Sequence, residues 1–276
     1  MMSRDLHETP ERDGTIRILF VGDVIGRPGR RVLQRLLSSL IDERLIDYVI
    51  VNVENSAGGI GITPDVIKEF DAMPIDCYSS GNHIWDKREG LPLLDKVDKL
   101  LRPANYPGDN PGKGIYVGET AGGVKVATMN LEGQVFMKNL HSPFEVAERL
   151  LDELDDDVKI VIVDFHAEAT SEKQAMGYFL DGRVSAVFGT HTHVPTADER
   201  ILAEGTALIT DVGMTGPYDG IIGFRVKEVL QRFATQRGVG LQVAKKDLRL
   251  AGALVDVEVE TGKAVAIERL LIPVTL

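Results

Sequence analysis

Residues 16–23 read IRILFVGD, a short apolar run that ends in glycine and aspartate. A run of this kind, bounded by a turn residue, is typical of a buried β-strand. The residues after it favour a helix, because apolar side chains recur on one helical face at Val32, Leu33, Leu36, Leu37 and Leu40. The alternation continues, with strands expected over 48–53 and 77–80 and a helix over 64–73. Strands that alternate with helices predict the α/β class and a mostly parallel sheet.

The second half of the chain carries the same kinds of element. Further buried strands are expected over 124–131, 159–165 and 185–189. Ser142 and Glu145 have the spacing of a capping box, which predicts the start of a helix. After a helix expected over 226–237, two segments of alternating hydrophobicity, 248–259 and 264–274, predict a closing antiparallel hairpin.

The sequence is that of one folded unit with a polar start. Its 276 residues are 43% hydrophobic and 26% charged, which is ordinary for a globular protein with a sizeable core. No internal repeat, low-complexity tract or linker divides the sequence, so we expect a single domain over 16–276. Residues 1–15, MMSRDLHETPERDGT, are largely polar and predict a disordered extension.

Composition also excludes several classes of protein. No apolar run approaches the roughly 20 residues that span a bilayer, and the first residues lack the apolar core of a secretory signal. The net charge of −11 disfavours binding along a nucleic-acid backbone, which depends on Lys and Arg. Cys77 is the one cysteine and has no partner for an internal disulfide, so we expect a reducing, cytoplasmic location.

Polar side chains of a particular kind follow five of the expected strands. They are Asp23, Glu54, Asn55, Asn82, His83, His166, His191 and His193. The carboxyl ends of parallel strands meet at one edge of a sheet, where ligands bind in open α/β folds. Carboxylate, amide and imidazole donors without thiolates suit manganese, iron, zinc or a similar first-row ion, and they exclude a cysteine-rich structural zinc site. The sequence therefore predicts a metal site at this edge, with His191 and His193 on one face of an extended segment.

All of these residues except His83 are plausible metal ligands, which is more than one ion can easily use. Two ions that share a bridging carboxylate would use them all. Ions about 3.5–4 Å apart clamp both the attacking and the leaving oxygen of an in-line displacement. His83 is left over, and its imidazole can either protonate a leaving oxygen near neutral pH or serve as one more ligand.

Longer motifs surround these residues. They are FVGDVIGRPGR at 20–30, NVENSAGGIGIT at 52–63, SGNH at 80–83, RPANYP at 102–107 and GTHTHVPT at 189–196. In this order they resemble the calcineurin-like binuclear metallophosphoesterases, and most closely the YmdB-type branch of bacterial phosphodiesterases that act on 2′,3′-cyclic nucleotides. The resemblance spans about residues 16–276, and it implies a four-layer α/β/β/α sandwich.

Three positions depart from the pattern of the wider superfamily. Ile25 stands where the first motif usually has histidine, Glu54 replaces the usual aspartate of the second motif, and Thr190 is an extra residue after the glycine of the last motif. In the YmdB-like branch a glutamate at the second of these positions bridges the metals, and the asparagine after it is a further ligand.

The resemblance implies a role for each site residue. The first metal ion would be bound by Asp23, Glu54, Asn55 and His193. The second would be bound by Glu54, Asn82, His166 and His191. His83 would be the proton donor. The branch also implies iron or manganese as the two ions, and self-association into a homodimer or homotetramer.

We therefore expect a phosphodiesterase whose substrate is a small 2′,3′-cyclic nucleotide. A hydroxide that bridges the two ions would attack phosphorus in line, while His83 protonates the leaving ribose oxygen. The strained five-membered ring needs less driving force than a linear diester, which suits a site with few basic residues. Two alternatives remain: a phosphomonoesterase or protein phosphatase with the same ligands, and a nucleotide-binding regulatory protein that turns over slowly.

Overall fold

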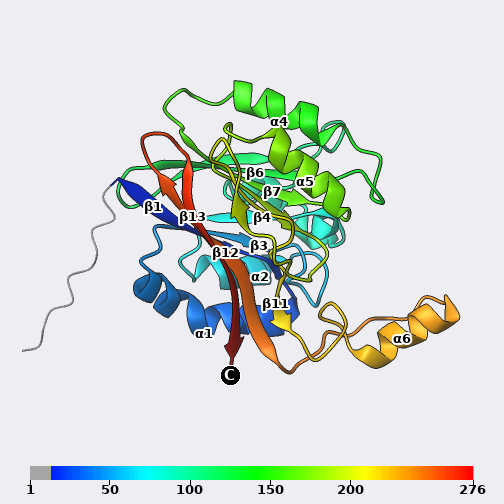
Figure 1. The fold of residues 1–276 in the computed structure, drawn as a ribbon. Helices are drawn as coiled ribbons and strands as arrows, with labels where there is room; N and C mark the ends of the chain where they lie inside the picture. The colour runs from blue at the N-terminus through cyan, green and yellow to red at the C-terminus, as the bar shows by residue number, and fades with distance from the viewer. Residues whose placement is uncertain (1–13, 276) are drawn as a thin grey trace, which may run out of the picture.

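Residues 14–275, the part of the chain that the computed structural model describes, form two β-sheets packed face to face between layers of helices (Figure 1). The expected disordered extension, residues 1–15, lies outside this part except for its last two positions. Thr15 already belongs to the first strand, one residue earlier than the apolar run indicates.

The first sheet combines the N-terminal strands with the C-terminal hairpin. Its strands are β1 (Thr15–Val21), β2 (Asp23–Val24), β3 (Tyr48–Asn52), β4 (Cys77–Ser79), β11 (Met214–Pro217), β12 (Leu248–Glu258) and β13 (Ala264–Val274). They lie in the order β2-β11-β12-β1-β3-β4, with β13 beside β12. Strands β1, β3 and β4 are parallel, and β12 and β13 form the antiparallel hairpin that the alternating pattern predicts.

The second sheet comes from the middle of the chain. Its strands are β5 (Ile115–Glu119), β6 (Lys125–Glu132), β7 (Ile160–His166), β8 (Ala186–Thr190), β9 (Arg200–Ile201) and β10 (Ala207–Ile209). They lie in the order β5-β6-β7-β8-β10-β9, and β6, β7, β8 and β10 are parallel. The register sets Glu132, His166 and Thr190 side by side at the carboxyl ends of their strands.

Six α-helices accompany the two sheets in the described part of the chain. They are α1 (Gly26–Arg44), α2 (Pro64–Asp71), α3 (Leu93–Lys96), α4 (Pro143–Asp152), α5 (Thr170–Phe179) and α6 (Val226–Thr235), with short 3₁₀ turns η1 (Asn82–Trp85) and η2 (Arg88–Gly90). Figure 1 shows α1 and α2 against the first sheet and α4 and α5 against the second. This arrangement confirms the expected four-layer α/β/β/α sandwich.

Apolar side chains fill each interface between layers. Phe20 and Phe188 meet between the two sheets, with their ring centroids 5.0 Å apart. Leu33 of α1 and Phe70 of α2 belong to the core on the outer side of the first sheet. Met176 of α5 belongs to the core on the outer side of the second sheet. None of the helices within residues 14–275 is long and apolar enough to cross a membrane.

Most expected elements are confirmed, and most of the differences lie around the last motif. Ser142 caps α4, and its side chain accepts a hydrogen bond from the Glu145 amide at 3.3 Å. The structure also contains elements that the sequence pattern did not predict, which are β2, α3, α5, β9, β10 and β11. Strand β8 also continues through Thr190, one residue beyond the expected end.

Replacing Phe188 by alanine removes a ring from the buried layer between the sheets. The lost apolar contacts and the remaining cavity predict a loss of about 3–5 kcal/mol in the free energy of unfolding, measured by urea denaturation. Phe136, which is 89% exposed, is the control. Its alanine variant should change the free energy of unfolding by less than about 0.5 kcal/mol. Equal losses in the two variants would contradict this placement of the core.

Candidate metal centre

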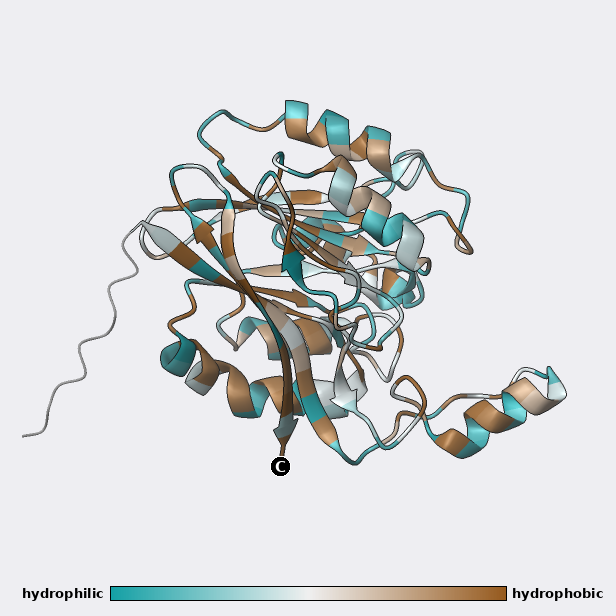
Figure 2. Ribbon diagram, viewed as in Figure 1, coloured by the Kyte–Doolittle hydropathy of each residue, from teal (hydrophilic) through white to brown (hydrophobic). Residues whose placement is uncertain are grey.

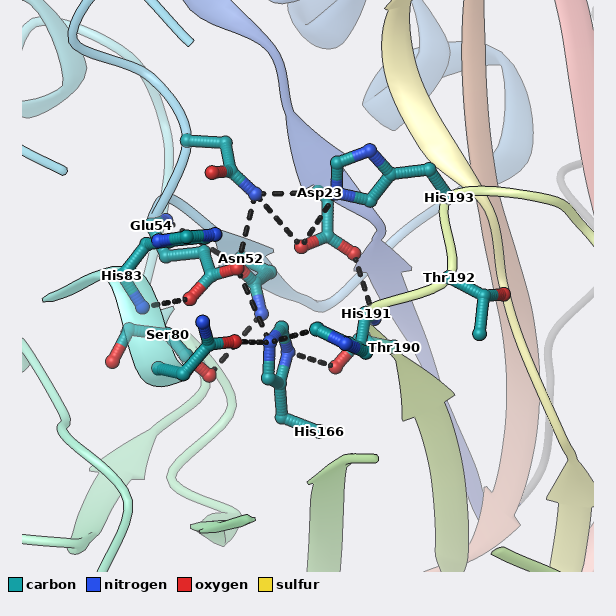
Figure 3. A network of polar contacts seen from close by, with 12 residues as sticks. Asp23, Asn52, Glu54, Ser80, His83, His166, Thr190, His191, Thr192 and His193 are labelled. Atoms are coloured by element: carbon teal, nitrogen blue, oxygen red, sulfur yellow. Dashed lines mark hydrogen bonds and ion pairs between the residues drawn. The ribbon is translucent and has the colours of Figure 1, made fainter. Parts of the chain in front are cut away.

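The carboxyl ends of the parallel strands of both sheets meet at one site. Figure 3 shows carboxylate and imidazole side chains from both sheets pointing toward one another there. The structure brings together all seven ligands that the sequence predicts: Asp23, Glu54, Asn55, Asn82, His166, His191 and His193.

One part of the site is built around His166. The ligand atoms of Glu54, His166 and His191 lie within 4.8 Å of one another, an arrangement that can hold a metal ion. His166 Nε2 lies 3.2 Å from Glu54 Oε1, 3.1 Å from His191 Nδ1 and 2.9 Å from Asn82 Oδ1. A ring nitrogen, a carboxylate and an amide oxygen therefore face the same small volume.

The second part of the site contains Asp23, Asn55 and His193. His193 Nε2 lies 3.7 Å from Asp23 Oδ1, and its Nδ1 donates to the carbonyl oxygen of Ile222 at 3.1 Å. The Asn55 amide nitrogen donates to Glu54 Oε1 at 3.0 Å and to Asp23 Oδ1 at 3.4 Å. Here Asn55 presents its nitrogen to the two carboxylates, so metal binding through its oxygen requires a half-turn of the amide.

Glu54 lies between these two parts. Its Oε1 contacts both His166 and Asn55, and its Oε2 accepts a hydrogen bond from the backbone amide of His83 at 2.9 Å. The Glu54 side chain is completely buried. This central position suits a carboxylate shared by two cations.

His83 lies at the edge of the site rather than among the ligands. Its side chain is 35% exposed, and its Nδ1 lies 2.6 Å from Asp86 Oδ2. Because Asp86 engages one ring nitrogen, Nε2 is left for another partner. A histidine with one ring nitrogen held by a carboxylate can use the other to donate a proton or to bind a metal ion.

The last motif is bent rather than extended. His191 and His193 have φ values of 96° and 66°, in the region that non-glycine residues rarely adopt, so the expectation that they share one face of an extended segment is wrong. Asp211 holds the bend, because its Oδ2 accepts hydrogen bonds from the Thr192 amide at 3.1 Å and hydroxyl at 2.7 Å. Lys173 of α5 forms a buried ion pair with the same carboxylate at 2.7 Å.

Glycines that precede the ligands allow close packing. A Cβ atom at Gly81 would lie 2.3 Å from His166 Nε2, and one at Gly22 would lie 2.0 Å from the Gly213 carbonyl oxygen. Neither contact is possible for a real side chain. Gly81 of the Gly-Asn-His motif therefore lets the first sheet pack against His166 of the second, and Gly22 of the Gly-Asp motif lets β2 and β11 pack closely within the first sheet.

The ionisable groups of the site shift one another's pKa values strongly. Burial raises the pKa of Asp23, because its carboxylate loses water. Burial also acts to raise the pKa of Glu54, but the His166 imidazole outweighs it and holds that pKa low. Burial and the charge of His166 lower the pKa of His191 to about 3. Burial acts to lower the pKa of the His166 imidazole, but the neighbouring Glu54 carboxylate outweighs it and raises that pKa to about 10, so His166 supplies positive charge beside these carboxylates.

The chemistry of the donors fits divalent or trivalent first-row ions. Oxygen and imidazole nitrogen donors suit manganese, iron and zinc. Cys77 stands apart, with its thiol directed at the Lys99 carbonyl oxygen, so the site as described has no thiolate ligand. This agrees with the donor set expected from the sequence.

Several residues of the site escape the sequence analysis. His191 Nε2 lies 3.1 Å from Glu168 Oε2, and Asp164 is completely buried, with a pKa that burial raises to about 7. Glu132 is also completely buried, and burial raises its pKa. Glu132 could have been predicted, because it directly follows the strand expected over 124–131, as the candidate ligands follow theirs. Lys173 and Asp211 gave no such signal.

Comparison with known proteins agrees with this site. The family model of YmdB-like proteins matches residues 19–270. The chain is 47% identical to the 2′,3′-cyclic-nucleotide 2′-phosphodiesterase of Bacillus subtilis strain 168 over 258 residues, which is 93% of this chain and 97% of that protein.

Solved structures extend the comparison to the fold. A hypothetical protein of Thermus thermophilus has a TM-score of 0.88 and 41% identity, over 94% of this chain and 100% of the other. A phosphatase from Mycoplasma pneumoniae has a TM-score of 0.88 and 35% identity, over 94% of each chain. Sequence and structure thus agree over nearly the whole length, and the chain belongs to the YmdB-like family.

Proposed function

We propose that this chain is a metal-dependent phosphodiesterase that hydrolyses 2′,3′-cyclic nucleotides. The observation that carries the proposal is the cluster of carboxylate, amide and imidazole side chains at one edge of two sheets, with the half-exposed imidazole of His83 beside it. The name of the Bacillus subtilis relative, 47% identical, supports the substrate class.

Two cations, iron or manganese, fit the donors of this site, with Glu54 as the shared ligand. The first would also be held by Asp23, Asn55 and His193. The second would also be held by Asn82, His166 and His191. Bound cations of this kind supply a hydroxide from water near neutral pH and neutralise charge on the phosphate oxygens.

His83 supplies the proton for the leaving ribose oxygen. Its Nδ1 is held by Asp86 at 2.6 Å, so Nε2 is the atom that donates. The contact with the Asp86 carboxylate also fixes the orientation of the ring. The hydrogen bond from the His83 backbone amide to Glu54 Oε2 keeps the imidazole ring next to the shared ligand.

The substrate is a small nucleotide in the cytoplasm rather than a nucleic-acid strand. The net charge of −11 opposes contact along a polyanionic backbone, whereas a small phosphate meets only the local field of the site. Cys77, a lone buried thiol, suits a reducing compartment.

Glu54→Gln should lose both metal content and activity, because the neutral amide cannot balance two cations. Hydrolysis of 2′,3′-cyclic AMP, 3′,5′-cyclic AMP and a simple phosphomonoester is measured with added Mn²⁺, and metal content by elemental analysis. The exposed Glu119 is the control, and its Gln variant should behave as the wild type. A fully loaded and active Glu54→Gln variant would contradict the shared-ligand role.

The same assay separates the alternatives. Preferred turnover of the phosphomonoester by the wild type would replace the proposal with a phosphatase. Tight nucleotide binding without turnover, with both metals bound, would indicate a regulatory protein instead.

His83→Ala should lower kcat by about 10²–10⁴-fold with metal content unchanged, because a proton donor is lost while the ligands remain. Steady-state kinetics and elemental analysis of the same preparation check this result. Loss of metal from the variant would show that His83 is a ligand.

We also propose that the chain forms a homo-oligomer through α6. Figure 1 shows this helix standing away from both sheets, and Figure 2 shows apolar bands along it. Val226, Leu230 and Phe233 recur at helical spacing and are 43%, 55% and 70% exposed. Segment 225–246 is basic, with six Lys or Arg residues and one Glu, whereas the chain as a whole is acidic. A second copy of this acidic chain offers the complementary charge.

Leu230→Glu combined with Phe233→Glu should dissociate the oligomer, because it places charges on the apolar stripe. Light scattering after size exclusion measures the mass. Val265→Glu, at a position 53% exposed on β13, is the control and should leave the mass unchanged. A wild-type protein that is monomeric at micromolar concentration would refute this proposal.

A further inference from the structure

We propose that Asp164 and Thr190 are positioning residues that fix the proton of His166 on Nδ1 and so keep its Nε2 free for a metal ion. This inference rests on the metal centre proposed above. It also gives a role to Thr190, the extra residue that distinguishes the last motif of this chain from the corresponding motif of the wider superfamily.

A chain of short contacts leads away from His166 on the side opposite the other ligands. His166 Nδ1 lies 2.9 Å from Thr190 Oγ1, and the Thr190 hydroxyl donates to Asp164 Oδ1 at 2.6 Å. All three side chains are completely buried. Figure 3 shows Thr190 beside the His166 ring, whose other nitrogen, Nε2, lies 2.9 Å from Asn82 Oδ1.

The direction of each hydrogen bond follows from Asn52. Its Nδ2 donates to Asp164 Oδ2 at 3.0 Å, while its Oδ1 accepts from the Glu54 amide at 3.2 Å. Asp164 therefore accepts at both oxygens, from Asn52 and from Thr190. The single proton of the Thr190 hydroxyl is used in this bond, so its oxygen can only accept from His166 Nδ1.

A proton fixed on Nδ1 determines what Nε2 can do. In neutral imidazole one nitrogen carries the proton and the other has the lone pair that binds metal. His166 Nε2 faces Glu54, Asn82 and His191, which is the place for the second ion. A carboxylate that acts on a histidine ligand through a hydrogen bond also fixes the ring orientation, and loss of such a partner typically weakens metal binding by about 10–100-fold.

The other two histidine ligands have simpler partners. His193 donates from Nδ1 to a backbone carbonyl, and His191 meets the carboxylate of Glu168. Only His166, of the three, reaches its carboxylate through a threonine in the described structure. The inserted Thr190 lies level with His166 in the paired strands β7 and β8, which sets the hydroxyl beside the ring.

Thr190→Val tests the proposal, because it keeps the shape of the side chain and removes the hydroxyl. Thr190→Ser restores the hydroxyl. Thr128→Val is the matched control, since Thr128 is equally buried on strand β6 of the same sheet and its hydroxyl has no hydrogen-bond partner within residues 14–275. Mn²⁺ binding is measured by competition with a chelator, and the melting temperature is measured with and without Mn²⁺.

We expect Thr190→Val to bind one of two Mn²⁺ ions about 10–100-fold more weakly and to show a smaller metal-induced rise in melting temperature. Thr190→Ser and Thr128→Val should match the wild type in metal binding. A lower melting temperature of metal-free Thr190→Val with unchanged Mn²⁺ affinity would overturn the proposal, because it would show a merely structural role.

A measurement on the wild type covers the case in which Thr190→Val does not fold. The ¹⁵N spectrum of histidine rings in the zinc-loaded protein should show the His166 proton on Nδ1, and a proton on Nε2 would overturn the proposal. The metal centre itself is judged separately. If the wild type binds no metal, the proposed function fails; if it binds two ions that Thr190→Val binds equally well, only the role of Thr190 and Asp164 fails.

Discussion

Two carboxylates buried without enough positive charge are the constraint on which this structure depends. Asp23 and Glu54 are completely inaccessible to water, and the charged side chains that face them are imidazoles. Removing a carboxylate from water is costly unless a cation or several hydrogen-bond donors compensate. The fold keeps the carboxylates together nonetheless, which is understandable for a protein that binds cations there. The buried carboxylates that would favour metal binding therefore destabilise the metal-free site.

The surrounding framework holds this unfavourable arrangement in place. The first sheet approaches His166 of the second closely because Gly81 has no side chain to separate them, and Gly22 allows close packing of β2 and β11 within the first sheet. The strained backbone at His191 and His193 is fixed by Asp211, which is itself held by Lys173 from the layer outside the sheet. Strain of this kind persists only where neighbouring contacts enforce it. Support for the ligands thus extends from the site through the second sheet to α5.

Features that arise from local sequence patterns could be predicted from the sequence, and features that depend on contacts between distant residues could not. Strands are encoded locally, in apolar runs followed by Asp, Glu, Asn or His, so the sandwich could be predicted, and so could the meeting of the seven candidate ligands at one edge. Helix α5 could not, because Glu172 and Lys173 are buried on it. Glu172 accepts hydrogen bonds from backbone amides of the loop after β6, and Lys173 pairs with Asp211, so polar residues interrupt the apolar periodicity. The bend at His191 depends on a carboxylate far away in the sequence, and no local pattern reveals it.

The charge of the site also explains how an acidic protein can act on an anion. Glu132 adds a third buried carboxylate beside His166, and its oxygens have no hydrogen-bond partner within the described residues. Three such carboxylates create a negative potential that retains cations and repels a phosphate from the empty site. In the proposed function, two bound divalent ions would offset these carboxylates while the outer surface stays acidic. Binding of the proposed cyclic phosphate would then depend on prior metal binding, and the acidic surface would disfavour long polyanions.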